Sequence, residues 1–265
     1  MNCMSGILEQ IVDVKRQELK RRKEEEKIYQ LEDRIGALPL PLNLSGSLMG
    51  GGVRLIAEAK KASPSKGILR DNYDPFALAS IYAQNGAAAM SVLTEVDHFQ
   101  GSLDHINLAR RGMGKVSLPI LRKDFIFDPY QVYEARAYGA DALLLIVAIL
   151  SPGLLKELLD SCRKLWMQAL VEVHNLQELE WAIDAGAEII GVNNRDLRTF
   201  ETSLSTTEEL VTHFPNDKII VSESGINSSE DISKLHRMGV HAALVGEAIV
   251  TQEDPGAKIR ELIGV

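Results

Sequence analysis

From residue 53 onward the sequence repeats one unit, in which a short apolar segment ends in polar residues and an amphipathic stretch follows it. The apolar segments predict eight β-strands, at residues 53–59, 88–93, 118–122, 142–146, 169–173, 189–192, 219–222 and 242–245. Consecutive segments are spaced by roughly 20 to 35 residues, which leaves room for a helix in each gap. Such a chain is expected to form parallel strands joined by right-handed crossovers.

Two architectures fit this alternation, a closed barrel and a doubly wound open sheet. Helical periodicity is clear at 128–138, 152–165, 176–185 and 227–238, and Gly139, Gly186 and Gly239 follow where positive φ often ends a helix. A doubly wound sheet usually carries GxGxxG after its first strand, and residues 58–67 contain nothing similar. Eight regular units within 265 residues therefore favour one (β/α)8 TIM barrel in the α/β class.

Residues 1–47 differ from the repeating part. Ile7, Leu8, Ile11 and Val12 form a short apolar stripe, a charge-rich run follows at 15–27, and prolines at 39 and 41 end the helical pattern. The charge run indicates either a solvated helix face or a lid over the following domain. We expect an N-terminal helical extension at 1–47 that caps a catalytic barrel at 48–265.

Composition narrows the possible partners. A net charge of −8 argues against a nucleic-acid partner, which would need a basic surface, but an anionic small molecule could bind where cations are concentrated in a pocket. The N-terminus does not have the pattern of a signal peptide, and the longest apolar run, 142–150, is too short to span a membrane. These features predict a cytoplasmic enzyme with no membrane partner.

Charged and polar residues stand at the carboxyl ends of five predicted strands. Because residues i and i+2 share a face of a strand, each of the following sets should point one way. They are Glu58 with Lys60, Lys123 with Phe125, Glu172 with His174, Asn193 with Arg195, and Glu223 alone. The carboxyl ends of barrel strands meet at one mouth, where barrel enzymes place their active sites.

This cluster has two explanations. Three cations (Lys60, Lys123, Arg195) facing three carboxylates (Glu58, Glu172, Glu223) could form a structural ion-pair network. The same balance can also move pKa values apart and so create acid and base roles in one site, which we favour.

The last two strands suggest a phosphate site. Ser224 and Gly225 follow strand seven and Gly246 follows strand eight, where this fold commonly binds phosphate through backbone N–H groups. Glu247 conflicts with that site, since its carboxylate would repel phosphate unless it turns outward. The loop at 61–67 could be either a mobile cover or an ordinary turn.

No metal or cofactor is expected. The histidines lack metal-ligand spacing, and Glu172 with His174 could supply only two ligands from one strand.

Four segments closely resemble indole-3-glycerol-phosphate synthase: IAEAKKASPSKG at 56–67, LRKDFI at 121–126, GVNNRDL at 191–197 and VSESGI at 221–226. The resemblance spans the chain, including the N-terminal extension, which caps the barrel mouth in that family. It implies conversion of 1-(2-carboxyphenylamino)-1-deoxyribulose 5-phosphate into indole-3-glycerol phosphate, with release of CO2 and water, in tryptophan biosynthesis.

The resemblance also implies roles for individual residues. Lys123 would be the general acid that protonates the ketone, Glu172 would act as base or stabilise positive charge on the anilino nitrogen, Lys60 and Glu58 would assist ring closure and dehydration, and Asn193 would orient the substrate. Ser224, Gly225 and Gly246 would hold the phosphate, Phe99 and Phe125 would flank the aromatic ring, and Arg195, Ser63 and Glu223 would line the site.

Two other functions fit part of this pattern. A phosphosugar isomerase or epimerase would often use a metal or a Cys/Asp pair, and no cysteine stands at a strand end. A sensor for a phosphorylated ligand would need the phosphate site but not both lysines and Glu172. We expect a monomer or weak homodimer that binds a small phosphorylated substrate.

Overall fold

The structure, a computed structural model, describes residues 6–196, 199 and 201–265. The last residue of one motif quoted above, Leu197, lies outside this range.

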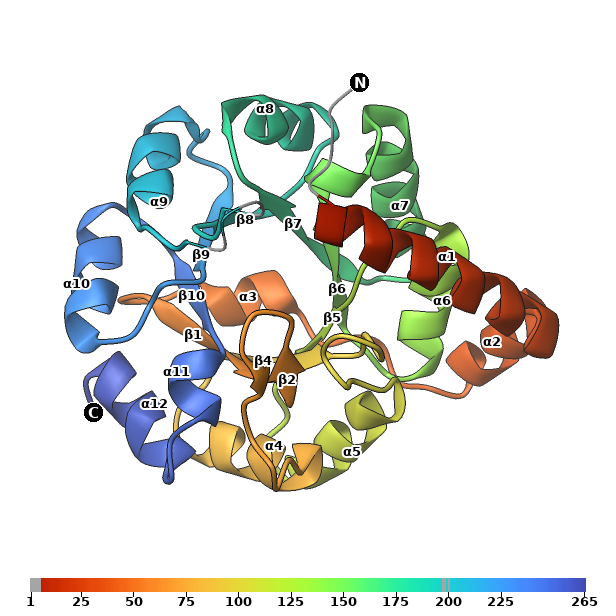
Figure 1. Cartoon of the computed structure of the whole chain (residues 1–265), viewed down its shortest axis with the longest axis horizontal. Coiled ribbons are helices and arrows are strands. Elements are labelled where there is room, and N and C mark those ends of the chain that lie inside the picture. The colour runs from red at the N-terminus through yellow and green to blue at the C-terminus, as the bar shows by residue number, and fades with distance from the viewer. Residues whose placement is uncertain (1–5, 197–198, 200) are drawn as a thin grey trace.

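Within the described residues, eight parallel strands close into a barrel in the order β1-β10-β9-β8-β7-β6-β5-β4 (Figure 1). Their bounds are β1 (Arg54–Ala59), β4 (Ala89–Leu93), β5 (Ile120–Lys123), β6 (Ala142–Ile146), β7 (Gln168–Val173), β8 (Ile189–Asn193), β9 (Ile219–Glu223) and β10 (Ala242–Val245). All eight predicted strands and the barrel are confirmed. β5 starts at Ile120 rather than residue 118, since Pro119 has no N–H to donate to a neighbouring strand.

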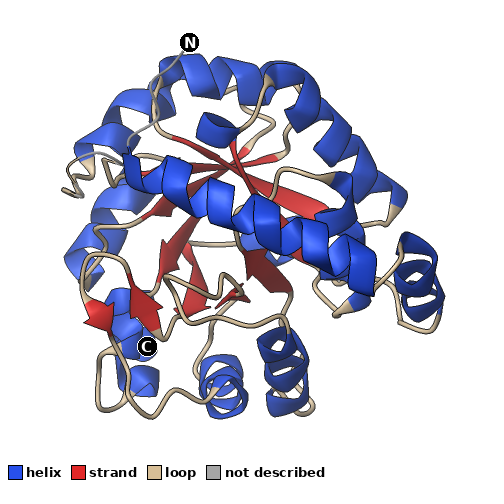
Figure 2. Cartoon of the chain, turned by 45° about the vertical axis from the view of Figure 1, so that its right-hand side comes forward, coloured by secondary structure: helices blue, strands red, loops and turns tan. Residues whose placement is uncertain are grey.

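Helices surround this barrel (Figure 2). They are α4 (Pro75–Gln84), α5 (Asp104–Gly112), α6 (Pro129–Ala137), α7 (Pro152–Lys164), α8 (Leu176–Asp184), α9 (Ser205–Leu210), α10 (Ser229–Arg237), α11 (Glu247–Val250) and α12 (Pro255–Ile263), with 3-10 turns η1 (Val147–Ile149) and η2 (Val211–His213). The four helices predicted from periodicity are confirmed. Gly139, Gly186 and Gly239 follow three of them with φ of 90°, 83° and 80°, a conformation that glycine adopts without steric cost.

The side chains pack in two apolar layers, because successive strand residues face opposite sides. Outward residues such as Met90 and Val171 pack with the helices, whereas inward residues such as Leu121, Leu144 and Leu170 fill the barrel. The inward side chains are apolar near the amino ends of the strands and polar at the carboxyl ends. The core therefore forms a floor beneath a polar mouth.

The N-terminal segment contains α1 (Gly6–Glu25), α2 (Ile28–Gly36) and α3 (Leu44–Leu48). α1 crosses the face of the barrel, and α2 lies beyond it against α6 (Figures 1 and 2). α3 closes the opposite end of the barrel, since Leu44 and Leu48 pack among the inward residues and Ser45 N–H donates to Gln168 at the start of β7, at 3.0 Å.

The charge-rich part of α1 is only partly a solvated face. Arg16 and Lys20 are exposed, whereas Lys15 is 3% exposed and points toward the barrel. No helix of the described chain has the length and apolarity needed to cross a membrane.

Candidate active site

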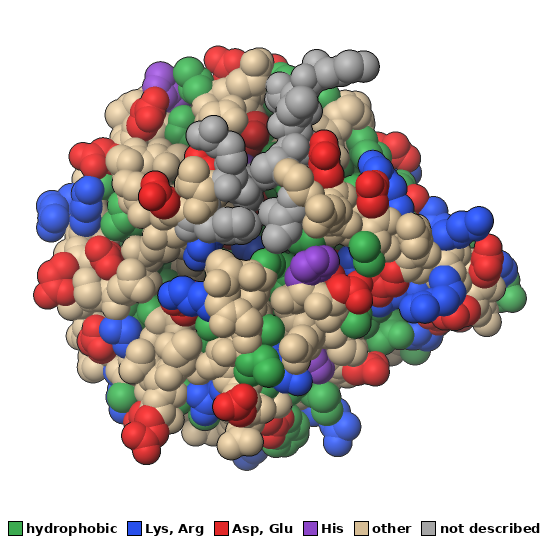
Figure 3. Space-filling model, in the orientation of Figure 1, with side chains coloured by type: hydrophobic (Ala, Val, Ile, Leu, Met, Phe, Trp, Pro, Cys, Tyr) green, Lys and Arg blue, Asp and Glu red, His purple; other side chains and the backbone are tan. Residues whose placement is uncertain are grey.

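A cavity of about 430 Å³ opens at the carboxyl ends of the strands. Figure 3 looks onto this face, and Lys and Arg side chains are visible near its middle. All thirteen predicted site residues line this cavity: Glu58, Lys60, Ser63, Phe99, Lys123, Phe125, Glu172, Asn193, Arg195, Glu223, Ser224, Gly225 and Gly246. They come from segments far apart in the sequence, and closure of the barrel brings them together.

The Lys123 ammonium lies between two carboxylates. Lys123 is the last residue of β5, and its Nζ contacts Oε2 of Glu223 and lies 3.4 Å from Oε2 of Glu172. Burial lowers the pKa of Lys123, but the attraction of Glu223 and Glu172 outweighs burial, so the pKa stands above its usual value. Lys123 is therefore protonated at neutral pH and has a proton to donate.

Glu172 accepts contacts on both of its oxygens. Its Oε1 accepts a hydrogen bond from Asn193 Nδ2 at 3.1 Å and lies 3.3 Å from His174 Nε2. Burial raises the pKa of Glu172, but Lys123 and His174 more than offset it, and the pKa falls below its usual value. The carboxylate is thus ionised and fixed in orientation.

His174 supplies a cation that the sequence did not reveal. Its Nδ1 lies 3.0 Å from Oε2 of Glu178, so the ring stands between two carboxylates. Burial lowers the pKa of His174, but Glu172 and Glu178 raise it to about 10. Within the described chain, no group of three His, Cys, Asp or Glu side chains could hold a metal ion, and the Glu172–His174 pair is an ion pair.

Glu223 is buried, and its Oε1 has no hydrogen-bond partner among the described residues. Burial raises the pKa of Glu223 more than Lys123 lowers it, and the negative charge of Glu172 raises it further. The carboxylate lies over Gly191 of β8, where an added Cβ would stand 2.1 Å from Oε1. Gly191 was not predicted as a site residue, although a glycine inside a strand is a known sign of close approach.

Glu58 and Lys60 form a second pair at the end of β1. Lys60 Nζ lies 2.9 Å from Glu58 Oε1. Burial raises the pKa of Glu58, but Lys60 and Lys123 outweigh it and the net shift is downward. A Cβ at Gly246 would lie 2.3 Å from the same oxygen, so a side chain there would displace the Glu58 carboxylate.

An apolar wall faces these charges. The rings of Phe99 and Phe125 have centroids 6.4 Å apart, and Leu8 and Ile11 of α1 complete the wall. The apolar stripe in the N-terminal segment was the signal for these two α1 residues, which the sequence did not assign to the site.

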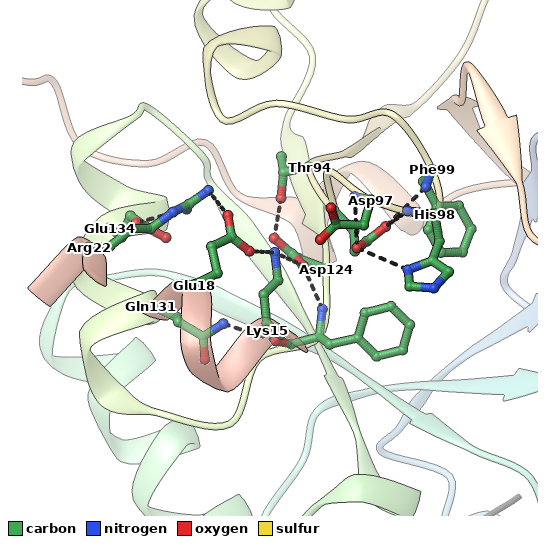
Figure 4. Close-up of polar contacts among 12 residues, drawn as sticks. Lys15, Glu18, Arg22, Thr94, Asp97, His98, Phe99, Asp124, Gln131 and Glu134 are labelled. Atoms are coloured by element: carbon green, nitrogen blue, oxygen red, sulfur yellow. Dashed lines mark hydrogen bonds and ion pairs between the residues drawn. The ribbon is translucent and has the colours of Figure 1, made fainter. Parts of the chain in front are cut away.

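The loop that carries Phe99 is held by the buried carboxylate of Glu95. It accepts the backbone N–H groups of Asp97, His98 and Phe99 at 3.1, 2.8 and 3.0 Å, and Figure 4 shows the loop turned around these contacts. Three N–H donors to one carboxylate fix the position of Phe99 in the wall.

The turns after β9 and β10 lie side by side at the cavity. Ser224 and Gly225 both adopt left-handed backbone conformations, with φ of 67° and 75°, so the chain turns sharply at the end of β9. Glu247 contacts the ammonium of Lys66, which belongs to the loop after β1. This ion pair offsets the charge that conflicted with a phosphate site.

Lys66 is part of a folded loop. Residues Ala62–Ser63 (β2) and Gly67–Ile68 (β3) form a small antiparallel hairpin beside the mouth.

Arg195 lies two residues after the end of β8. Its backbone N–H donates a hydrogen bond to Oδ1 of Asn193 at 3.1 Å.

Comparison with known proteins agrees with this geometry. A family model described as indole-3-glycerol phosphate synthase matches residues 8–262. An indole-3-glycerol phosphate synthase of Dehalococcoides mccartyi is 54% identical over 258 residues, covering 97% of this chain and 100% of that protein. The corresponding protein of a Roseiflexus species is 52% identical over 267 residues, covering 98% of this chain and 99% of that protein.

Among solved structures, a thiamine phosphate pyrophosphorylase from Pyrococcus furiosus has a TM-score of 0.62 at 17% identity, covering 83% of this chain and 96% of that one. A 3-hexulose-6-phosphate synthase from Salmonella typhimurium has a TM-score of 0.61 at 14% identity, with coverage of 80% and 97%. These two show a shared fold alone. The family match and the full-length relatives establish that the chain belongs to the indole-3-glycerol phosphate synthase family.

Proposed function

We propose that this chain converts 1-(2-carboxyphenylamino)-1-deoxyribulose 5-phosphate into indole-3-glycerol phosphate, CO2 and water. The observation that carries the proposal is Lys123, a cation only 16% exposed in its side chain at the mouth of a barrel of this family, held between Glu172 and Glu223. The reaction needs an acid group and a base group beside an anionic substrate. The cavity contains a cationic lysine that can act as the acid and carboxylates that can act as the base.

Ring closure comes first. The substrate's ring carbon that bears the carboxylate attacks the ketone carbon, and Lys123 donates a proton to the ketone oxygen as its negative charge develops. The raised pKa of Lys123 suits this timing, since the developing alkoxide is more basic than an amine. Breaking of the bond to the carboxylate then releases CO2, and the bonding electrons restore the aromatic ring.

Dehydration follows. The substrate nitrogen supplies electrons as the new hydroxyl takes up a proton and leaves as water, and loss of a proton from the closed five-membered ring then makes that ring aromatic. Glu172, ionised and oriented by Asn193, stabilises the positive charge on nitrogen or accepts a proton. The Lys60–Glu58 pair supplies the acid and base that assist these steps.

Binding uses the rest of the cavity. Ser224, Gly225 and Gly246 hold the phosphate, because their turns allow backbone N–H groups to approach an anion closely. Phe99 and Phe125 flank the aromatic ring. Arg195 and Ser63 line the cavity between these regions, and Glu223 holds Lys123 before substrate arrives.

We further propose that residues 1–47 cap the barrel at 48–265. The short helix α3 connects the two parts. The protein should act as a monomer or weak homodimer, since every residue given a role comes from one chain. A place in tryptophan biosynthesis would put it in the cytoplasm.

The test is to incubate the purified protein with this substrate and follow indole fluorescence without added metal or cofactor. Lys123→Ala should lower turnover to background. Circular dichroism should still show an intact fold, because water from the cavity can occupy the space left by the lysine side chain. Lys156→Ala, which removes an exposed lysine of α7, is the matched control and should keep full activity. An inactive wild-type protein would exclude the synthase activity, and a fully active Lys123→Ala would exclude Lys123 as the acid.

A further inference from the structure

A closed ring of six alternating charges joins α1 to β5 and α6. Three members lie on α1, one on β5, one directly after β5 and one on α6. In order around the ring they are Lys15, Asp124, Arg122, Glu134, Arg22 and Glu18, with Glu18 returning to Lys15.

Geometry and burial both mark this ring as tightly built. Lys15 Nζ lies 3.0 Å from Asp124 Oδ1 and 2.9 Å from Glu18 Oε2, and Arg122 bridges Asp124 and Glu134 at 2.9 Å each. The side chains of Arg122 and Asp124 are fully buried. Charges out of water are costly unless they are paired, and here each one has two opposite neighbours. Figure 4 shows Lys15, Glu18 and Arg22 reaching from the helix toward Asp124 and Glu134.

The ring touches the site through Asp124, which lies between Lys123 and Phe125 in the sequence. Oδ1 of Asp124 accepts the backbone N–H of Phe125 at 2.9 Å, and Oδ2 accepts the hydroxyl of Thr94 at 2.6 Å. The carboxylate therefore fixes the backbone that carries Lys123 on one side and Phe125 on the other. Both of those side chains line the cavity.

The other side of the ring reaches the apolar wall. Ile11 and Leu8 stand about one and two helical turns before Lys15, on the same face of α1, and both line the cavity. The Lys15–Asp124 ion pair thus ties the wall made by α1 to the residue that follows β5.

We infer that Lys15 is a positioning residue for the reaction: through Asp124 it fixes Lys123 and Phe125 relative to Leu8 and Ile11. The inference rests on the proposed synthase activity. Without Lys15, Asp124 would keep a buried charge with one fewer cation and would turn toward water, which would move the backbone on either side of it.

The helix has other anchors, so loss of Lys15 should not detach it. Lys23 Nζ lies 2.6 Å from Asp128, and the Tyr130 hydroxyl donates to the Arg22 and Glu26 carbonyls at 3.2 and 2.9 Å. These contacts lie near the C-terminal half of α1. They keep the helix docked but do not reach the end of β5.

The experiment compares Lys15→Met with Lys20→Met, which removes an exposed charge from the same helix. Both variants are assayed at a temperature well below their unfolding midpoints, so that the rates are those of folded protein. Lys15→Met should lower kcat at least tenfold and raise KM less, because β9 and its phosphate contacts lie across the barrel from β5. Lys20→Met should stay within twofold of the wild type in both constants.

A purely structural role would lower the unfolding midpoint of Lys15→Met and leave kcat of the folded protein unchanged, and that result would overturn the inference. Lys15→Arg, which keeps a cation, should recover part of the lost kcat, and no recovery would equally count against it. Should Lys15→Met not fold, Glu18→Gln decides: it removes the charge that orients Lys15, and an unchanged kcat would overturn the inference. An inactive wild-type protein would instead refute the proposed function.

Discussion

Replacement of Gly191 by alanine tests whether the Glu223 carboxylate must stay over β8. The new Cβ would stand 2.1 Å from Oε1 of Glu223 and 3.2 Å from a methyl group of Leu170. Since ordinary contacts begin near 3.4 Å, the carboxylate oxygen must retreat by about 1 Å or more. That movement carries Oε2 away from the Lys123 ammonium, which then has Glu172 as its nearest carboxylate.

The fold should tolerate this change better than the chemistry does. Overpacking costs about 1–3 kcal/mol, while loss of glycine's unfolded-state freedom offsets roughly 0.5–1 kcal/mol. At about 2–4 °C per kcal/mol for a chain of this size, the unfolding midpoint should fall by no more than ~10 °C. A displacement of about 1 Å in a catalytic group can lower the rate by as much as ~100-fold, so kcat should fall between about 10- and 100-fold.

The assay follows formation of the fluorescent indole product under single-turnover conditions, with the unfolding midpoint measured in parallel. Gly153→Ala is the matched control, because Gly153 lies in the exposed first turn of α7 and an added Cβ would meet no described atom within 4 Å. If Gly191→Ala and Gly153→Ala turn over substrate equally fast, the placement of Glu223 does not matter for catalysis and the reasoning is refuted.

Two further variants test the phosphate site and His174. Ser224→Asp should raise KM at least tenfold, because its charge would repel the phosphate, and should cost little stability, because aspartate tolerates left-handed φ. The control is Ser205→Asp at the exposed start of α9, which should leave KM unchanged. An unchanged KM in Ser224→Asp as well would place the phosphate elsewhere. His174 has a folded pKa of about 10 against an ordinary 6.5, so its stabilisation is complete below pH 6.5 and is lost as pH rises through about 10. Between pH 6.5 and 10 the free energy of unfolding should therefore fall further in the wild type than in His174→Gln, by on the order of a few kcal/mol. If the two proteins have equal pH profiles of stability, His174 is not held as a cation.

Strand periodicity explains why the fold and the cavity lining were predictable. Alternation along one strand places Glu172 inward, and parallel strands must end at one mouth, so no distance had to be known in advance. Glu247 was the one charge that the pattern could not place. Its partner, Lys66, lies 181 residues away in the sequence, and their contact depends on a hairpin whose shape the sequence did not specify.

The charge-rich run of α1 shows the limit of such reasoning. Lys15 and Arg16 are adjacent, identical in charge type and indistinguishable by composition, yet one is buried and the other is 64% exposed in its side chain. The difference depends on where Asp124 lies relative to the docked helix. That relation depends on the docking of α1, to which the apolar packing of Leu8, Val12 and Leu19 contributes and which the charge pattern alone does not reveal.

The end of β5 carries three consecutive charged residues, which serve two separate networks because of strand alternation. Arg122 and Asp124 point outward into the ring shared with α1 and α6, and Lys123 points inward between Glu172 and Glu223. A one-residue slip of β5 would exchange these faces, placing a guanidinium and a carboxylate in the cavity and an ammonium in the ring. Two features oppose such a slip: Pro119, which has no N–H to donate if it moves into a donor position of the ladder, and the hydrogen bond at 3.0 Å from Arg122 to the carbonyl of Gln131. The charge ring and the proposed acid thus depend on the same strand register, so a perturbation that shifts β5 should disturb both together.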